Sequence, residues 1–252
     1  MTATTSIRNA AAAATWLGMV ATPLNRRGGG ARRVLSNLVV GGLATTTTAA
    51  VARRLGWSRA AGGVTAVAGL TTVVERLGTV TGVPFGAYHY TEALRPKVGG
   101  VPAIVPLAWW AMAVPARESA RAALGAGETR CRRIVLGAAA LTAWDLFLDP
   151  QMTAEGYWRW ASAGRYRGIP ATNYLGWFLT SIAVMGVLEV AVPVDDEPPA
   201  DDLVVTYAAM TAMETVGFAA FFRDRLVAVV GGVAMLPIAY AALAGNLRSR
   251  RA

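Results

Sequence analysis

The sequence predicts an all-α protein, a polytopic membrane bundle of seven or eight transmembrane helices. Of its 252 residues, 54% are hydrophobic and only 15% are charged, whereas soluble domains average about 25% charged residues. The mean hydropathy is positive, at +0.41. Several apolar stretches are long enough to cross a bilayer, for which about 20 residues are needed.

Three parts of the chain differ in character. Residues 1–33 form an N-terminal segment whose alanine-rich stretch, residues 10–24, is shorter than a full span. We expect this stretch to lie at the membrane interface, with an eighth span as the alternative. Residues 34–245 are expected to form a single transmembrane domain, and residues 246–252 a basic tail.

Seven apolar stretches are expected to cross the membrane in alternating directions. They are residues 34–52, 60–83, 98–116, 134–148, 171–194, 203–222 and 226–245. The second, fourth and sixth spans therefore end on one face. The two most unusual loops, residues 84–97 and 150–170, leave the helices at that same face.

The charge pattern argues against nucleic acid as a partner. The net charge is +9, but the arginines stand in small groups at the ends of apolar stretches, as membrane anchors do. The chain has one histidine, His89, and one cysteine, Cys131, and it has no nucleotide-binding glycine motif. We therefore expect no metal and no cofactor.

Four acids within or at the end of these spans are the candidate catalytic residues. A charged side chain at the centre of a bilayer costs about 2.5–3.5 kcal/mol, so such residues are usually functional. The second, fourth and sixth spans place them in one half of the membrane. The four are Glu75, Asp145, Asp149 and Glu214.

Asp145 and Asp149 belong to the motif LTAWDLFLDPQM and share one helix face, because they are four residues apart. Two ionised carboxylates this close in apolar surroundings repel each other, so one is expected to keep its proton. A neutral carboxylic acid there is a proton donor. The alternative is that Asp149 ends the helix before Pro150 while Asp145 pairs with an arginine.

Glu75 opens the motif ERLGTVTGVPFGAYHY, in which Pro84 and Gly86 are expected to break the helix. Two interpretations of Glu75 and its neighbour Arg76 stay open. Each pairs with a charge on another helix, or Glu75 faces a cavity while Arg76 orients an acid. Glu214 is either a second proton-transfer group or the partner of Arg76.

Aromatic and polar side chains near the two loops are candidate substrate-binding residues. The motif GYWRWASAGRYRGIPATNYLGW alternates rings with arginines, which is typical of an interfacial belt. Some rings are also expected to line a pocket, where an aromatic face attracts a cation. Trp109 and Trp110 are expected to pack or to face lipid. The candidates are Tyr88, His89, Tyr90, Trp144, Trp158, Trp160, Tyr166, Asn173 and Tyr174.

These motifs, together with VGGVPAIVPLAWW at residues 98–110, resemble the membrane carotenoid biosynthesis proteins of the CruF type, which hydrate acyclic carotenoid ends. The resemblance covers about residues 75–177. It implies a multi-pass protein of the cell membrane that adds water to the terminal double bond of an acyclic or monocyclic carotenoid. The product is a tertiary alcohol. Association with itself or with other carotenoid enzymes is a further expectation.

In the mechanism we expect, a neutral carboxyl protonates the alkene, with Asp145 favoured as the donor. Aromatic faces and a carboxylate, Asp149 or Glu75, stabilise the carbocation, which water then attacks. Two other enzyme classes stay open, a carotenoid end-group cyclase and a prenyltransferase-like enzyme. A small transporter or proton channel is the non-enzyme alternative. A retinal-binding photoreceptor is excluded because the only lysine, Lys97, lies in a loop.

Overall fold

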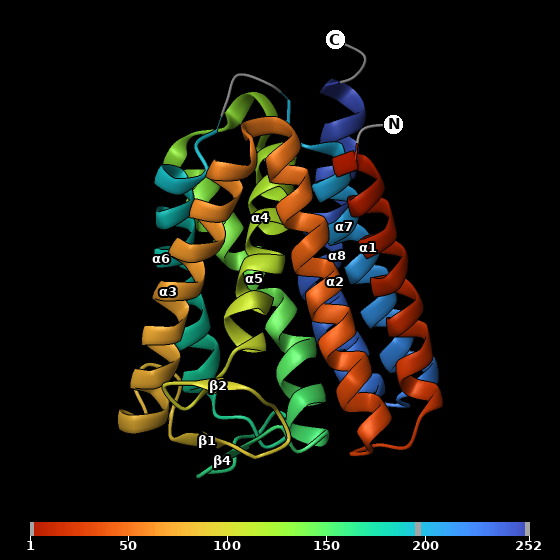
Figure 1. The fold of residues 1–252 in the computed structure, drawn as a ribbon, viewed down its shortest axis with the longest axis vertical. Helices are drawn as coiled ribbons and strands as arrows, with labels where there is room; N and C mark the ends of the chain where they lie inside the picture. Colours follow the sequence, from red (N-terminus) through yellow and green to blue (C-terminus); the bar gives the residue numbers. More distant parts are fainter. Residues whose placement is uncertain (1–2, 195–197, 250–252) are drawn as a thin grey trace.

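The computed structural model describes residues 3–194 and 198–249, and these form eight α-helices in one antiparallel bundle (Figure 1). The prediction of an all-α fold is confirmed. The helices are α1 (Ala3–Ala21), α2 (Gly30–Leu55), α3 (Trp57–Thr81), α4 (Ile104–Leu124), α5 (Arg130–Ala154), α6 (Ala171–Ala191), α7 (Asp201–Val216) and α8 (Arg225–Ser249). Short helical turns precede α2 and α5, and a π-helical turn, Gly217–Phe221, extends α7.

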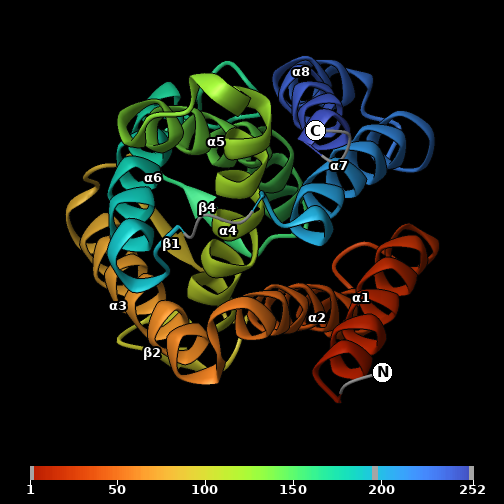
Figure 2. The ribbon, with the colours of Figure 1, turned by 90° about the horizontal axis from the view of Figure 1, so that it is seen from above.

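Helix α4 lies at the centre of the bundle, in contact with α2, α3, α5, α6, α7 and α8. Viewed from above, the α1–α2 pair and the α7–α8 pair diverge from it as two arms (Figure 2). The core position of α4 follows from its sequence, because nearly every residue from Trp109 to Ala122 is small, apolar or paired, and all are buried.

Four of the helices in the described part of the chain are long and apolar enough to cross a membrane. These are α2, α6, α7 with its π-helical extension, and α8. They indicate a membrane protein. The expected count of seven or eight spans stays a prediction.

The N-terminal stretch is longer and better packed than the sequence indicated. Residues 10–24 were expected as a short segment, but α1 has 19 residues and packs along α2. The two backbones come close at Gly42, where a Cβ atom would lie 2.5 Å from Oγ1 of Thr15. Whether α1 crosses the membrane stays a prediction.

Two of the boundaries that differ from the expected spans bear on the site. Residues 98–103 were assigned to the third span, but β2 (Lys97–Val98) and β3 (Val101–Pro102) pair there and α4 begins at Ile104. The fourth span was expected to end at Leu148, but α5 continues through Pro150 to Ala154. Asp149 is therefore inside the helix, and the alternative that it ends the helix is wrong.

Helix α5 tolerates Pro150 because a side chain replaces the missing hydrogen bond. Proline has no N–H, so the carbonyl four residues earlier, that of Leu146, loses its helical donor. The hydroxyl of Tyr166 donates to this carbonyl at 2.8 Å. Helix α4 repeats the arrangement at Pro115, where the hydroxyl of Thr47 donates to Ala111 at 2.9 Å.

A two-stranded sheet lies across one end of the bundle (Figure 1). Strand β1 (Tyr88–Tyr90) pairs antiparallel with β4 (Trp158–Trp160), which sets Tyr88 opposite Trp160 and Tyr90 opposite Trp158. Because side chains alternate along a strand, both tyrosines project to one side while His89 is exposed on the other. The sheet thus brings the two unusual loops together.

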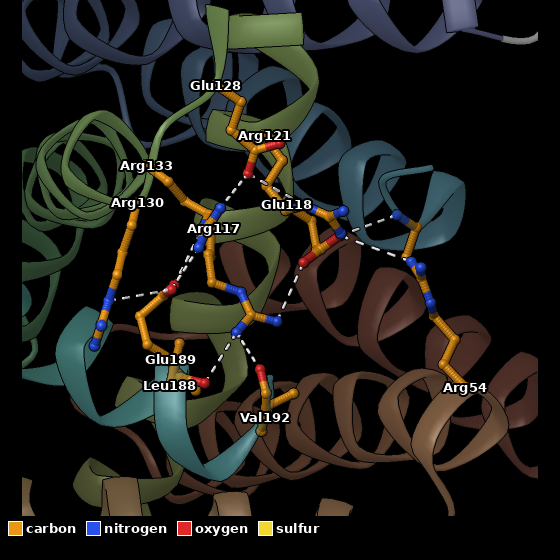
Figure 3. A network of polar contacts seen from close by, with 11 residues as sticks. Arg54, Arg117, Glu118, Arg121, Glu128, Arg130, Arg133, Leu188, Glu189 and Val192 are labelled. Carbon is orange, nitrogen blue, oxygen red and sulfur yellow. Dashed lines mark hydrogen bonds and ion pairs between the residues drawn. The ribbon is translucent and has the colours of Figure 1, made fainter. Parts of the chain in front are cut away.

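The opposite end of the bundle carries a network of buried ion pairs (Figure 3). Glu118 on α4 accepts from Arg121 at 2.9 Å and lies 3.2 Å from Arg117. Arg117 also donates to the carbonyls that end α6, at 3.1 Å to Leu188 and 2.5 Å to Val192. Glu189 on α6 joins the network through Arg133 at 2.5 Å.

Candidate functional site

A cavity, here called the acid cavity, lies beside the β1–β4 sheet. Helices α2 to α6 and both loops line it, and its empty space, counted together with the part open to solvent, is about 670 Å³. Two of the four candidate acids, Glu75 and Asp149, line it from different helices. The expected second and fourth spans, α3 and α5, thus bring one acid each to the same cavity.

Asp145 and Asp149 are joined by one amide. Nδ2 of Asn173 on α6 donates to Oδ2 of Asp145 and to Oδ2 of Asp149, at 2.8 Å each. Asp145 is 0% exposed and Asp149 is 1% exposed. The structure therefore makes the two aspartates a buried pair, as their spacing predicted, and adds Asn173 as the link.

The two members of the pair have different surroundings. Oδ1 of Asp149 accepts from Thr153 at 3.0 Å and from the indoles of Trp158 at 2.6 Å and Trp160 at 3.4 Å. Oδ1 of Asp145 is buried with no hydrogen-bond partner among the described residues, and Asp145 does not line the cavity. Of these two aspartates, Asp149 is the one that lines the acid cavity and can contact a molecule bound there.

Glu75 is held by three donors. The hydroxyls of Tyr88 and Tyr90 donate to Oε2, the latter at 2.7 Å, and Nε1 of Trp109 donates to Oε1 at 2.9 Å. Charge-assisted hydrogen bonds of this kind stabilise a carboxylate. Glu75 thus faces the cavity, as one of the two sequence interpretations had it, whereas Arg76 is exposed.

No cation neutralises these acids within residues 3–194 and 198–249. None of the ion pairs formed there involves Glu75, Asp145 or Asp149. The alternative in which Asp145 pairs with an arginine is therefore wrong for the described chain. Burying several carboxylates without a counter-charge is costly unless some stay neutral.

The two tyrosines of β1 remain hydroxyl donors over the physiological range. Burial is the main cause that raises the pKa of Tyr88, and the neighbouring Glu75 carboxylate raises it further. The same two causes, in the same order, raise the pKa of Tyr90. Both hydroxyls therefore keep the protons that they donate to Glu75.

Eight aromatic rings line the cavity. Trp109 and Trp177 stack with ring centroids 3.9 Å apart, and Tyr88 packs on Trp160 at 5.1 Å. The wall has very little polar surface apart from the acids and their donors. The rings that line the cavity are Phe85, Tyr88, Tyr90, Trp109, Tyr157, Trp158, Trp160 and Trp177.

Five of the nine candidate binding residues line the acid cavity: Tyr88, Tyr90, Trp158, Trp160 and Asn173. The other four lie elsewhere. His89 is exposed, and the hydroxyl of Tyr166 donates a hydrogen bond to the Leu146 carbonyl. Tyr174 packs against Tyr166 with ring centroids 6.0 Å apart, and Trp144 lines a neighbouring cavity.

Glu214 on α7 does not join the other acids. It lines the neighbouring cavity and is buried. The structure shows no ion pair between Glu214 and Arg76, which lie on opposite sides of the bundle, on α7 and α3 (Figure 2). Of its two sequence interpretations, only a role as a second proton-transfer group stays open.

Sequence reasoning missed four rings of the site, Phe85, Trp109, Tyr157 and Trp177. Trp109 was expected to pack or face lipid, but it binds Glu75, while Trp110 packs as expected and donates to Thr48 at 2.9 Å. Trp177 and Phe85 were not among the candidates. Phe85 could have been found from Gly176, where a Cβ atom would lie 2.8 Å from its ring. The glycine makes room for the ring.

The fold and the site define a helical membrane protein with an aromatic cavity that holds buried acids. The sequence model of one family, described as carotenoid biosynthesis protein, matches residues 34–246. The chain belongs to this family. Searches of curated proteins and of solved structures give no match.

Proposed function

We propose that this protein hydrates the terminal double bond of an acyclic carotenoid end, giving a tertiary alcohol, in the cell membrane and without a cofactor. Membership of the family supports a role in carotenoid biosynthesis. The observation that carries the reaction is the Asp145–Asn173–Asp149 arrangement, two buried carboxyls sharing one amide at 2.8 Å. Such a pair retains a proton that an alkene can take.

The proton donor in this proposal is Asp149. The sequence favoured Asp145, but Asp145 does not line the cavity and Asp149 does. After donation, Asp149 becomes a carboxylate that Asn173, Thr153, Trp158 and Trp160 already point at. Preorganised donors of this kind stabilise charge that develops during a reaction. Asp145 acts as a positioning residue that shares the proton through its closeness to Asp149.

The reaction balances without any other reagent. The Asp149 proton adds to the less substituted alkene carbon, whose π electrons form the new C–H bond. The tertiary carbocation lies among aromatic faces and opposite the Glu75 carboxylate, both of which stabilise a cation. A water oxygen then bonds to the cationic carbon, and its surplus proton returns to Asp149.

Expression in cells that accumulate an acyclic carotenoid tests the proposal. The expected product has gained the mass of one water molecule and absorbs at nearly the same wavelength. Asp149→Asn should lower its yield by roughly 10²–10⁴-fold, the usual contribution of a positioned acid. A ring-containing product of unchanged mass would show that the protein is a cyclase and not a hydratase. An unchanged carotenoid in cells that contain the membrane-inserted protein would contradict both activities.

A further inference from the structure

A second cavity adjoins the acid cavity and has no place in the mechanism above. It lies between α1 and α2 on one side and α5 and α7 on the other, and its empty space, counted together with the part open to the surroundings, is about 1080 Å³. We call it the chain cavity. Four methionines contribute to its wall, Met19, Met152, Met210 and Met213. Methionine is unbranched and adaptable, so such a wall fits a long apolar ligand rather than one of fixed polar shape.

The two cavities meet. Five residues line both of them: Ser36, Val40, Ala108, Leu148 and Met152. Leu148 and Met152 stand on either side of Asp149 in the sequence of α5. A linear molecule whose end reaches Asp149 therefore has an apolar path into the chain cavity.

The chain cavity also reaches the outer surface of the bundle. Three of its lining residues are large hydrophobic side chains that are more than half exposed, Val20 at 56%, Val216 at 56% and Phe221 at 59%. They belong to α1, α7 and the π-helical turn, which stand on the two diverging arms of the bundle (Figure 2). In a membrane protein, an exposed apolar rim of this kind faces lipid.

We propose that the chain cavity binds the unreacting part of a linear isoprenoid substrate, which enters from the lipid between α1 and α7. This inference rests on the proposed function for the position of the reacting end. The β1–β4 sheet lies beside the acid cavity, and the residues that line both cavities connect it to the chain cavity. The chain cavity thus selects the length and shape of the substrate, while the acid cavity selects its end.

Filling the chain cavity tests this inference. Met213 lines only the chain cavity, and Val216 stands at its exposed rim. Met213→Trp and Val216→Trp are expected to lower kcat/KM for a long acyclic carotenoid by about tenfold or more, because overpacking opposes binding. A short isoprenoid with the same terminal dimethyl alkene fits the acid cavity alone, so its turnover should change by less than about twofold.

The matched control is Val229→Trp on α8, whose valine is 61% exposed and lines neither cavity. This control should leave both substrates unaffected. Because Val216 is exposed, its replacement by tryptophan should not disturb folding. The Val216→Trp variant therefore still tests the inference if the variant at the more buried Met213 fails to fold. Equal losses on the long and short substrates, or no loss on either, would overturn the inference.

A binding measurement separates this inference from the proposed function. Asp149→Asn protein in lipid nanodiscs should bind the long carotenoid, detected by the visible circular dichroism that a bound polyene acquires. Adding Val216→Trp should weaken that binding by about tenfold. If the wild-type protein binds in this way but never hydrates, the proposed function fails and the chain cavity stands. If it hydrates and the filled variants bind normally, the chain cavity assignment fails.

Discussion

At the residue scale, the neighbours of each acid decide what it can do. Glu75 and Asp149 both face the acid cavity, and each accepts hydrogen bonds from several donors. Asp145 has one donor and no access to the cavity. The residues are chemically alike, so the proposed mechanism uses their surroundings to assign Glu75 to cation stabilisation and Asp149 to proton transfer.

Removing one donor from Glu75 tests that assignment. Tyr90→Phe keeps the ring but loses the 2.7 Å hydrogen bond. A hydrogen bond to a charged group is worth about 1.5–3 kcal/mol, so hydration should slow by roughly 10–100-fold. Initial rates with the purified protein measure this effect.

Arg159→Gln is the matched control, because Arg159 lies in the same sheet but is exposed on the side away from the cavity. Its rate should equal that of the wild type. A Tyr90→Phe rate equal to that of the control would show that the donors around Glu75 do not assist the reaction.

The acids were predictable from the sequence and most of their partners were not. A carboxylate in an apolar stretch is easily recognised in the sequence because the residues around it are uncharged and apolar. The partners Trp109 and Trp158 are not visible in the same way, since a tryptophan near a membrane boundary is ordinary. The alternation in YHY and WRW was a usable signal, because residues two apart share a face only in a strand.

At the element scale, the end of α5 that bears Asp149 depends on a hydrogen bond from outside the helix. Tyr166→Phe leaves the Leu146 carbonyl without a donor, since Pro150 supplies none. A buried carbonyl left unpaired costs about 1–3 kcal/mol. We expect a lower midpoint of thermal unfolding, measured by circular dichroism in detergent.

Pro150→Ala provides an internal check on this explanation. Alanine restores the N–H that donates to Leu146, so Tyr166→Phe should cost less in that background than in the wild type. The same loss in both backgrounds would mean that Tyr166 stabilises the protein in another way. This dependence explains why the sequence suggested that the helix ends before Pro150, because the compensating hydroxyl is sixteen residues further along the chain.

At the scale of the whole molecule, the acid cavity and the ion-pair network around Glu118 occupy opposite ends of the bundle. The acid cavity lies beside the β1–β4 sheet, which is at one end of the bundle (Figure 1), and the Glu118 network lies near the other end, toward the end of α4 (Figure 3). Glu118 contacts Arg117, Arg121 and Arg54, and accepts from the Ala200 backbone N–H at 3.1 Å. This network ties α2, α4 and the start of α7 together.

Glu118→Gln should therefore affect stability rather than chemistry. Removing one partner of a buried ion pair costs roughly 3–5 kcal/mol, so the midpoint of thermal unfolding should fall markedly. The turnover per folded molecule and the product should not change, because the cavity is at the other end.

Glu92→Gln is the comparison for Glu118. Glu92 pairs with Arg95 and Lys97 but its side chain is 69% exposed, so its loss should shift the unfolding midpoint far less. Similar shifts for the two variants, or an altered product from Glu118→Gln, would contradict this division of roles.

The helical bundle itself followed from the sequence, since apolar stretches of membrane length allow few other structures. The placement of α1 along α2 did not follow, because a short alanine-rich segment gives little hydrophobic signal and its packing depends on Gly42. Neither did the chain cavity, whose wall combines residues from α1, α2, α5 and α7. The cavity depends on how the helices diverge, and this divergence cannot be predicted from the sequence of each helix alone.

The most direct test of the central claim, that Asp149 hands a proton to a carotenoid alkene and water completes the reaction, is isotopic labelling. Purified protein is incubated with an acyclic carotenoid in deuterated, heavy-oxygen water, and the product is analysed by mass spectrometry. We expect one carbon-bound deuterium and one heavy oxygen for each modified end, and almost no product from Asp149→Asn. A product oxygen that is not labelled by water, or full activity in Asp149→Asn, would contradict the account.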